Sequence, residues 1–155
     1  AGWSRTPKSV AGVECFAGEE GLRPFLARTD ILVVLLPLTP DTRGILDQKL
    51  FSTLARDGAL GGPVVINAGR GGLQHEADLL TALDDGTLIG ASLDVFGEEP
   101  LPAASPFWDH PKVMLTPHAA ASSEASVLAR TILKQIEAFE RGEPLRNLVD
   151  RERAY

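Results

Sequence analysis

The feature that most constrains the fold is the stretch over residues 64–72, which reads Val-Val-Ile-Asn-Ala-Gly-Arg-Gly-Gly. Its three β-branched residues predict a short buried strand, and the glycines that follow predict a tight loop. Arg70 then stands at the carboxyl end of that strand, where ligands bind in an open α/β sheet. A guanidinium there suits a carboxylate or phosphate, because its planar fork offers two parallel hydrogen bonds. An ordinary surface arginine in a turn is the alternative.

The rest of the chain alternates predicted strands and helices. The apolar run at 31–36 has no polar alternation, which predicts a strand buried on both faces of a parallel sheet. Short loops between strands and helices indicate right-handed crossovers. We therefore expect an α/β fold with a doubly wound parallel sheet. The further predicted strands are 13–16, 88–95 and 112–116, and the predicted helices are 19–28, 47–54, 76–84 and 123–141.

Composition narrows the possible functions. At 155 residues the chain can form one domain with a real core or part of a larger protein. A net charge of -6 argues against a nucleic-acid partner, since no basic stripe could neutralise phosphates. The single cysteine, Cys15, allows no internal disulfide and has no neighbouring metal ligands, so we expect no metal and a cytoplasmic location. No apolar run is long enough to span a bilayer, so we expect no membrane partner.

Chemically distinctive loops follow the predicted strands. They contain Leu36-Pro37, residues 67–70, residues 94–99 and Pro117-His118. The carboxyl ends of parallel strands meet at one edge of a sheet, which predicts a single cleft there.

Three side-chain types in that cleft suit one reaction. A carboxylate, either Glu98 or Glu99, would hold His118 in one tautomer and favour its charged form, so that it could act as a general acid. Arg70 could clamp a substrate carboxylate and polarise the adjacent carbonyl. Together they fit reduction of a 2-oxo acid with hydride from a nicotinamide. The alternatives are a plain turn at His118 and solvated carboxylates.

The order of the motifs resembles the D-isomer-specific 2-hydroxyacid dehydrogenase family. The motifs are Asn-Ala-Gly-Arg-Gly at 67–71, Leu-Asp-Val-Phe at 93–96 with Glu99-Pro100, and Thr-Pro-His at 116–118. Further stretches at 12–18, 105–111 and 149–155 resemble the branch of the family that reduces glyoxylate and hydroxypyruvate. The resemblance covers nearly the whole chain.

The resemblance implies a role for each matching residue. Arg70 would hold the substrate carboxylate and carbonyl, His118 would be the general acid, and Glu99 would be its partner. Asp94 would lie near the nicotinamide amide. The remaining implied cofactor contacts are Leu36, Pro37, Ala68, Gly69 and Ala120, with Ser4, Arg5, Thr6 and Lys8 at the adenine ribose.

The ribose loop bears on the choice of cofactor. An acidic residue there would bond the ribose hydroxyls of NAD and repel an added phosphate, but this chain offers Ser4, Arg5 and Lys8. NADP is therefore expected to be preferred, with NAD possible. Solvent-facing charges without a ligand are the alternative for Arg5 and Lys8.

One family motif is missing, because no GxGxxG phosphate-binding turn occurs in the sequence. Family members are roughly twice as long, in keeping with two domains. We therefore expect residues 1–121 to be a partial dinucleotide-binding domain that lacks its first βαβ unit. Residues 122–155 would be a helix and tail that return to an absent substrate domain. The fragment alone is expected to be inactive, and the full-length protein is expected to be a homodimer.

Two other functions remain open at this point. The same fold could act on another 2-hydroxy acid, such as a phosphoglycerate-type substrate, because the residues that select the substrate mostly lie outside this chain. A non-catalytic protein that senses NAD(H) is the other alternative. Arg70, Glu99 and His118 together favour an enzyme.

Overall fold

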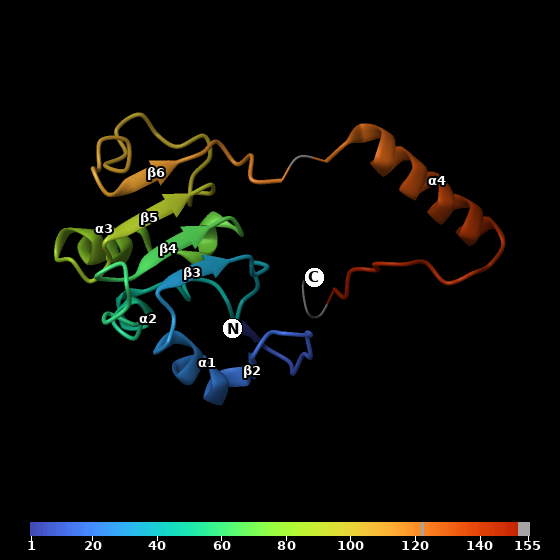
Figure 1. Ribbon diagram of the computed structural model, residues 1–155. Coiled ribbons are helices and arrows are strands. Elements are labelled where there is room, and N and C mark those ends of the chain that lie inside the picture. Colours follow the sequence, from blue (N-terminus) through green and yellow to red (C-terminus); the bar gives the residue numbers. More distant parts are fainter. Residues whose placement is uncertain (122, 152–155) are drawn as a thin grey trace.

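The computed structural model describes residues 1–121 and 123–151, and it consists of parallel strands with flanking helices (Figure 1). A two-stranded sheet pairs β1 (Gly2–Ser4) with β2 (Cys15–Ala17). A four-stranded sheet follows in the order β3-β4-β5-β6. Every ladder is parallel, which confirms the predicted Rossmann-like α/β class. The strands of the larger sheet are β3 (Ile31–Val34), β4 (Val64–Asn67), β5 (Gly90–Leu93) and β6 (Val113–Leu115).

Helices connect β2 to β3, β3 to β4 and β4 to β5, as the sequence predicts. α1 (Gly18–Leu26) has Glu19 and Glu20 in its first turn, where their negative charges stabilise the helix by interacting with the positive end of its dipole. In α2 (Gln48–Phe51) the backbone N–H of Leu50 donates to the side chain of Asp47, which caps the helix. The other helices are α3 (Glu76–Asp84), the 3-10 turn η1 (Gly71–Leu73) and α4 (Ala125–Glu140).

The hydrophobic core lies on one face of the four-stranded sheet. Side chains alternate between the two faces along a strand, and Leu32, Val65 and Leu93 all point to the buried face. They pack in one cluster with residues of α1, α2 and α3, among them Phe51 and Leu83, which are both 0% exposed. α1, α2 and α3 thus form one layer against the sheet.

The prediction that the run 31–36 is buried on both faces is wrong for this chain. Leu32 and Val34 are buried, but Ile31 is 50% and Val33 55% exposed. The reason is that α1, α2 and α3 all contribute to the core on one face of β3. The strand also ends at Val34, and an irregular segment at 35–39 leads to the turn that begins at Pro40. β1 is a further difference, since the sequence analysis predicted no strand at residues 2–4.

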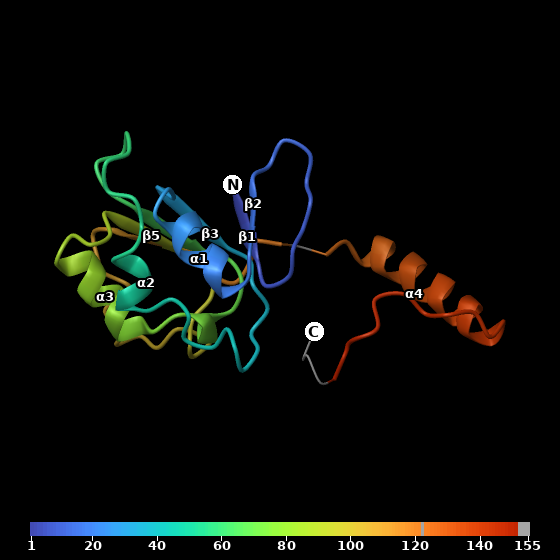
Figure 2. The same ribbon diagram turned by 90° about the horizontal axis from the view of Figure 1, so that it is seen from below.

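α4 stands apart from the sheet layers in both views (Figures 1 and 2). None of its residues is buried, and its apolar side chains Leu128, Ile132 and Ile136 are each about half exposed. Within residues 1–121 and 123–151, no helix is both long and apolar enough to cross a membrane. The part of the predicted tail at 152–155 lies outside the described residues.

Candidate active site

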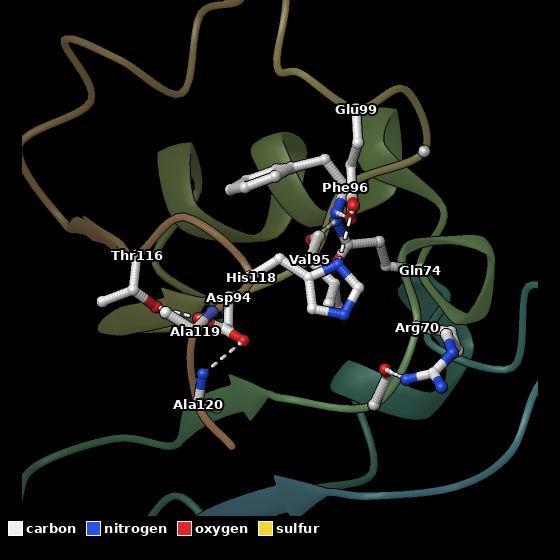
Figure 3. Close-up of polar contacts among 12 residues, drawn as sticks. Arg70, Gln74, Asp94, Val95, Phe96, Glu99, Thr116, His118, Ala119 and Ala120 are labelled. Carbon is white, nitrogen blue, oxygen red and sulfur yellow. Dashed lines mark hydrogen bonds and ion pairs between the residues drawn. The ribbon is translucent and has the colours of Figure 1, made fainter. Parts of the chain in front are cut away.

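Three neighbouring strands bring the predicted catalytic residues to one edge of the sheet (Figure 3). Arg70 follows β4, Glu99 follows β5 and His118 follows β6. Because these strands are parallel and paired in register, the loops after them emerge on the same side. The sequence-based expectation that these loops converge is therefore confirmed.

Glu99 and His118 are in direct contact. Nδ1 of His118 lies 2.7 Å from Oε2 of Glu99, and Oε1 of Glu99 accepts a hydrogen bond from the backbone N–H of Phe96 at 2.9 Å. The bond to His118 and the bond from Phe96 stabilise the carboxylate more than its burial disfavours it, so the pKa of Glu99 is lowered. Glu99 rather than Glu98 is thus the partner of the histidine.

Asp94 holds the turn that carries His118. Its Oδ1 accepts bonds from the Thr116 hydroxyl at 2.5 Å and the Ala119 N–H at 2.8 Å, and its Oδ2 accepts from the Ala120 N–H at 3.0 Å. His118 lies between these anchors with φ of 52°, a left-handed conformation that is uncommon outside glycine. Burial disfavours the charged form of Asp94, but the three hydrogen bonds outweigh it, and its pKa is lowered.

Arg70 is exposed, and its Nη1 donates to the carbonyl oxygen of Gly69 at 2.7 Å. The loop that carries it is fixed by Asn67, which is 0% exposed. Nδ2 of Asn67 donates to the Arg70 carbonyl at 3.2 Å and to Oε1 of Gln74 at 2.9 Å, while its Oδ1 accepts from the Gly69 N–H at 3.1 Å. Gln74 in turn donates to the carbonyl of Val95, which ties this loop to the loop after β5.

Sequence analysis missed the positioning role of Asn67, Gln74 and Thr116. For Asn67 a signal existed, since a polar residue at the end of a buried strand needs hydrogen-bond partners. Gln74 and Thr116 offered no comparable signal, because their partners are distant in the sequence.

Gly71 permits the close packing of these loops. A Cβ at this position would lie 1.8 Å from the carbonyl oxygen of Phe96, which is far inside contact distance. Any larger residue would push the Arg70 loop away from the loop that carries Glu99.

A pocket of about 570 Å³ opens beside the acid–base pair. Glu99, Thr116 and His118 line its polar side. Arg70 is not part of its lining, so the predicted single cleft is only partly enclosed by the described residues. The apolar lining consists of Phe96, Pro100, Leu101, Trp108, Leu115 and Pro117.

The residues expected at the cofactor lie in two groups. Ser4 is the last residue of β1, and Arg5, Thr6 and Lys8 follow it. The Ser4 hydroxyl donates to the Thr6 carbonyl, and Nη1 of Arg5 lies 3.7 Å from a carboxylate oxygen of Asp41. The second group follows the larger sheet's strands.

Leu36, Pro37, Ala68, Gly69, Asp94 and Ala120 form that second group. A Cβ on Gly69 would lie 2.9 Å from the Leu36 carbonyl oxygen, which shows how closely the loops after β3 and β4 approach. Within the described ranges, no three His, Cys, Asp or Glu side chains are grouped as metal ligands would be.

Several known proteins are similar to this chain. The chain is 46% identical over 153 residues to the glyoxylate/hydroxypyruvate reductase A of Yersinia enterocolitica. That alignment covers 99% of this chain and 47% of the Yersinia protein, so the chain spans about half the length of this curated relative.

Two solved structures show the same fold. One is an NADPH-dependent glyoxylate/hydroxypyruvate reductase from Sinorhizobium meliloti in complex with NADP and sulfate, with 55% identity and a TM-score of 0.96. It matches 99% of this chain and 48% of that one. The other is a D-isomer specific 2-hydroxyacid dehydrogenase from Xanthobacter autotrophicus in complex with NADPH and MES, with 45% identity, a TM-score of 0.92, and 99% and 61% of the two chains covered.

A sequence profile decides the family. Residues 1–120 match the profile described as the NAD binding domain of D-isomer specific 2-hydroxyacid dehydrogenases. This range includes Arg70, Asp94, Glu99 and His118, and it covers most of the 155 residues. The chain therefore belongs to the D-isomer-specific 2-hydroxyacid dehydrogenase family.

Proposed function

We propose that the full-length protein containing this chain reduces small 2-oxo acids, such as glyoxylate and hydroxypyruvate, to 2-hydroxy acids with NADPH. The observation that carries the proposal is the contact between His118 and Glu99 on a turn anchored by Asp94. The names of the Yersinia and Sinorhizobium relatives support the substrate class. The alternatives of another 2-hydroxy acid and of a non-catalytic sensor are distinguished by the assay below.

His118 is the proton donor in this proposal. In this role the Nδ1–H group of His118 donates a hydrogen bond to Oε2 of Glu99. That bond fixes the orientation of the ring and leaves Nε2 to face the substrate. His118 then transfers a proton from Nε2 to the carbonyl oxygen as that oxygen gains negative charge.

Arg70 binds the carboxylate and polarises the carbonyl. One of its N–H groups is used by the Gly69 carbonyl, and the structure gives no other hydrogen bond of its guanidinium within residues 1–121 and 123–151. The remaining N–H donors can form a bidentate contact with a carboxylate. The network of Asn67 and Gln74 would keep the loop in place while this contact forms.

The residues from the end of β1 onward fit NADP better than NAD. Arg5 and Lys8 supply positive charge and Ser4 and Thr6 supply hydroxyl groups, a set that suits a ribose phosphate. The solved relatives with bound NADP or NADPH support this choice. The nicotinamide supplies hydride to the carbonyl carbon when it is bound. Leu36, Pro37, Ala68, Gly69, Asp94 and Ala120 would line the cofactor along the strand ends.

We also propose that the chain contains parts of two domains. Residues 1–121 would be part of the dinucleotide-binding domain, and residues 122–155 would belong with the substrate domain. The exposed apolar side chains of α4 support this division, because such a stripe is normally buried against another element. Homodimer formation by the full-length protein remains a prediction.

The test is an NADPH oxidation assay with purified full-length protein. Glyoxylate, hydroxypyruvate, a bulkier 2-oxo acid and a phosphorylated one are compared by kcat/KM. The proposal requires the first two to be the better substrates and NADPH to be preferred over NADH. Turnover of only the bulkier or the phosphorylated acid would show that the enzyme acts on another 2-hydroxy acid. NADPH binding without turnover of any acid would favour a non-catalytic sensor.

A further inference from the structure

We propose that Glu76 is a positioning residue for the acid–base pair of Glu99 and His118. Glu76 is the first residue of α3, and its Oε1 accepts a hydrogen bond from the backbone N–H of Gly97 at 2.8 Å. Gly97 lies two residues before Glu99, in the loop that follows β5. The role of Glu76 rests on the proposed reductase function, in which Glu99 orients the ring of His118.

The peptide plane between Val95 and Phe96 is held at both ends. The Val95 carbonyl accepts a hydrogen bond from Nε2 of Gln74 at 3.1 Å, and the Phe96 N–H donates to Oε1 of Glu99 at 2.9 Å. Because a peptide group is planar, a bond that fixes its carbonyl also fixes the direction of its N–H. Gln74 therefore directs the Phe96 N–H toward the Glu99 carboxylate.

The next peptide plane, between Phe96 and Gly97, depends on Glu76. The carbonyl oxygen of Phe96 packs against Gly71, where a Cβ would lie only 1.8 Å from it. At the other end of the plane, the Gly97 N–H donates to Glu76. A glycine backbone adopts φ values that other residues avoid, so Gly97 itself does little to fix this plane. Without the bond to Glu76 the plane can turn about the axis between its two Cα atoms.

The place of Glu99 depends on that plane. Its Oε1 accepts from the Phe96 N–H, which precedes the plane, whereas its Oε2 lies 2.7 Å from Nδ1 of His118, on the loop after β6. A turn of the plane changes φ of Gly97 and moves the Cα of Glu99 relative to both partners. The two contacts of Glu99 therefore persist together only while the plane keeps its orientation.

The segment that holds this loop also carries Arg70. Three residues shortly after Arg70 contact the loop that leads to Glu99, namely Gly71, Gln74 and Glu76. Nε2 of Gln74 also lies 3.5 Å from Oε1 of Glu76. The guanidinium and the acid–base pair thus share one support. Proton transfer to a substrate held by Arg70 needs that fixed geometry, because small displacements of reacting groups slow a reaction strongly.

A purely structural role for Glu76 has a matched control in Asp78. Both are acidic residues in the first turn of α3, where negative charge stabilises the helix. Oδ2 of Asp78 accepts from the Gln48 N–H at 3.1 Å, and its Oδ1 lies 3.1 Å from Nδ1 of His75. Asp78 therefore joins α3 to α2, whereas Glu76 joins α3 to the loop that carries Glu99.

Single-turnover oxidation of NADPH by glyoxylate tests the role in the full-length protein. Glu76→Ala should slow this step about fivefold or more, because Glu99 loses its place beside the histidine. The Kd for NADPH should stay within about twofold of wild type. Glu76→Gln should keep the wild-type rate, since its amide oxygen can still accept the Gly97 N–H. Asp78→Ala should lower Tm but leave the rate unchanged.

Three kinetic outcomes would overturn the proposal. A wild-type rate in Glu76→Ala would show that the bond to Gly97 does not affect the acid–base pair. An equally slow Glu76→Gln would make the charge of the side chain, rather than the hydrogen bond, the cause. An equally slow Asp78→Ala would attribute the loss to a weakened α3.

Nuclear magnetic resonance of the full-length protein with 15N-labelled histidine supplies a readout that needs no turnover. The ring signals of His118 are identified by their absence from His118→Ala. Glu76→Ala should move their 15N chemical shifts toward those of Glu99→Ala, whereas Glu76→Gln and Asp78→Ala should leave them in place. Unchanged shifts in Glu76→Ala would overturn the proposal. A wild type without turnover would remove the proposed reductase function, yet these shifts would still test the link between Glu76 and His118.

Discussion

Nδ1 of His118 lies 2.7 Å from Oε2 of Glu99, although 19 residues separate the two in the sequence. The second oxygen of Glu99 is held by the backbone N–H of Phe96, so the carboxylate cannot rotate away without losing a hydrogen bond. Phe96 therefore fixes the Glu99 carboxylate, and that carboxylate in turn fixes the orientation of the His118 ring.

Replacing Glu99 with glutamine should lower kcat of the full-length protein by about tenfold or more, because it removes the carboxylate that orients the His118 ring for proton transfer. The Kd for NADPH should stay unchanged. Glu98→Gln is the matched control, since Glu98 is exposed and does not contact the histidine. Equal kinetics of the two variants would show that Glu99 has no part in proton transfer.

Replacing Arg70 with lysine should raise KM for the 2-oxo acid and lower kcat/KM about tenfold or more, since an ammonium group cannot form the bidentate contact. Arg56→Lys is the control, because Arg56 precedes β4 and lies toward the opposite end of that strand. Steady-state kinetics with glyoxylate provide the measurement. A change in NADPH affinity alone would make Arg70 a cofactor ligand instead.

Replacing Asn67 with alanine should lower the free energy of unfolding by about 1–3 kcal/mol, because the buried Gly69 N–H and Gln74 side chain lose their partner. Urea denaturation of the wild type, Asn67→Ala, Gln74→Ala and the double variant measures this. The two single effects should not add, since the side chains bond to each other. Strict additivity would argue against the network.

Asp94 gives a defined acid dependence. Its pKa is lowered in the folded chain, so its stabilising contribution is present above the ordinary value of 3.8 and is lost as pH falls through the lower folded pKa. Asp94→Asn should therefore be less stable than the wild type at neutral pH, and the difference in unfolding free energy should shrink below pH 3.8. A difference that stays constant through the acid range would contradict the assigned hydrogen bonds.

Periodicity predicted the elements whose pattern is set locally. The helix predicted at 76–84 matches α3, because its leucine stripe packs on the core with glutamate and aspartate in its first turn. The 31–36 run shows the limit of this reasoning. Its unbroken apolar pattern is typical of a strand that is covered on both faces of the sheet. In the described chain the helices cover only one face of this strand.

The sequence predicted which side chains make up the candidate site, but not the hydrogen bonds that hold them in place. Arg70, Glu99 and His118 stood out because each follows a strand and carries suitable chemistry. The left-handed turn at His118 and its anchoring by Asp94 depend on contacts across 22 to 26 residues, which no local pattern encodes. β1 was missed for a similar reason, since three residues with one apolar side chain give no recognisable alternation.

The most direct test of the account is the kinetics of His118→Ala in the full-length protein with NADPH and glyoxylate. Loss of the proton donor should lower kcat by about 100-fold or more while the Kd for NADPH, measured by fluorescence titration, stays within about twofold of wild type. A kcat equal to that of the wild type would contradict the central claim that the His118–Glu99 pair delivers the proton.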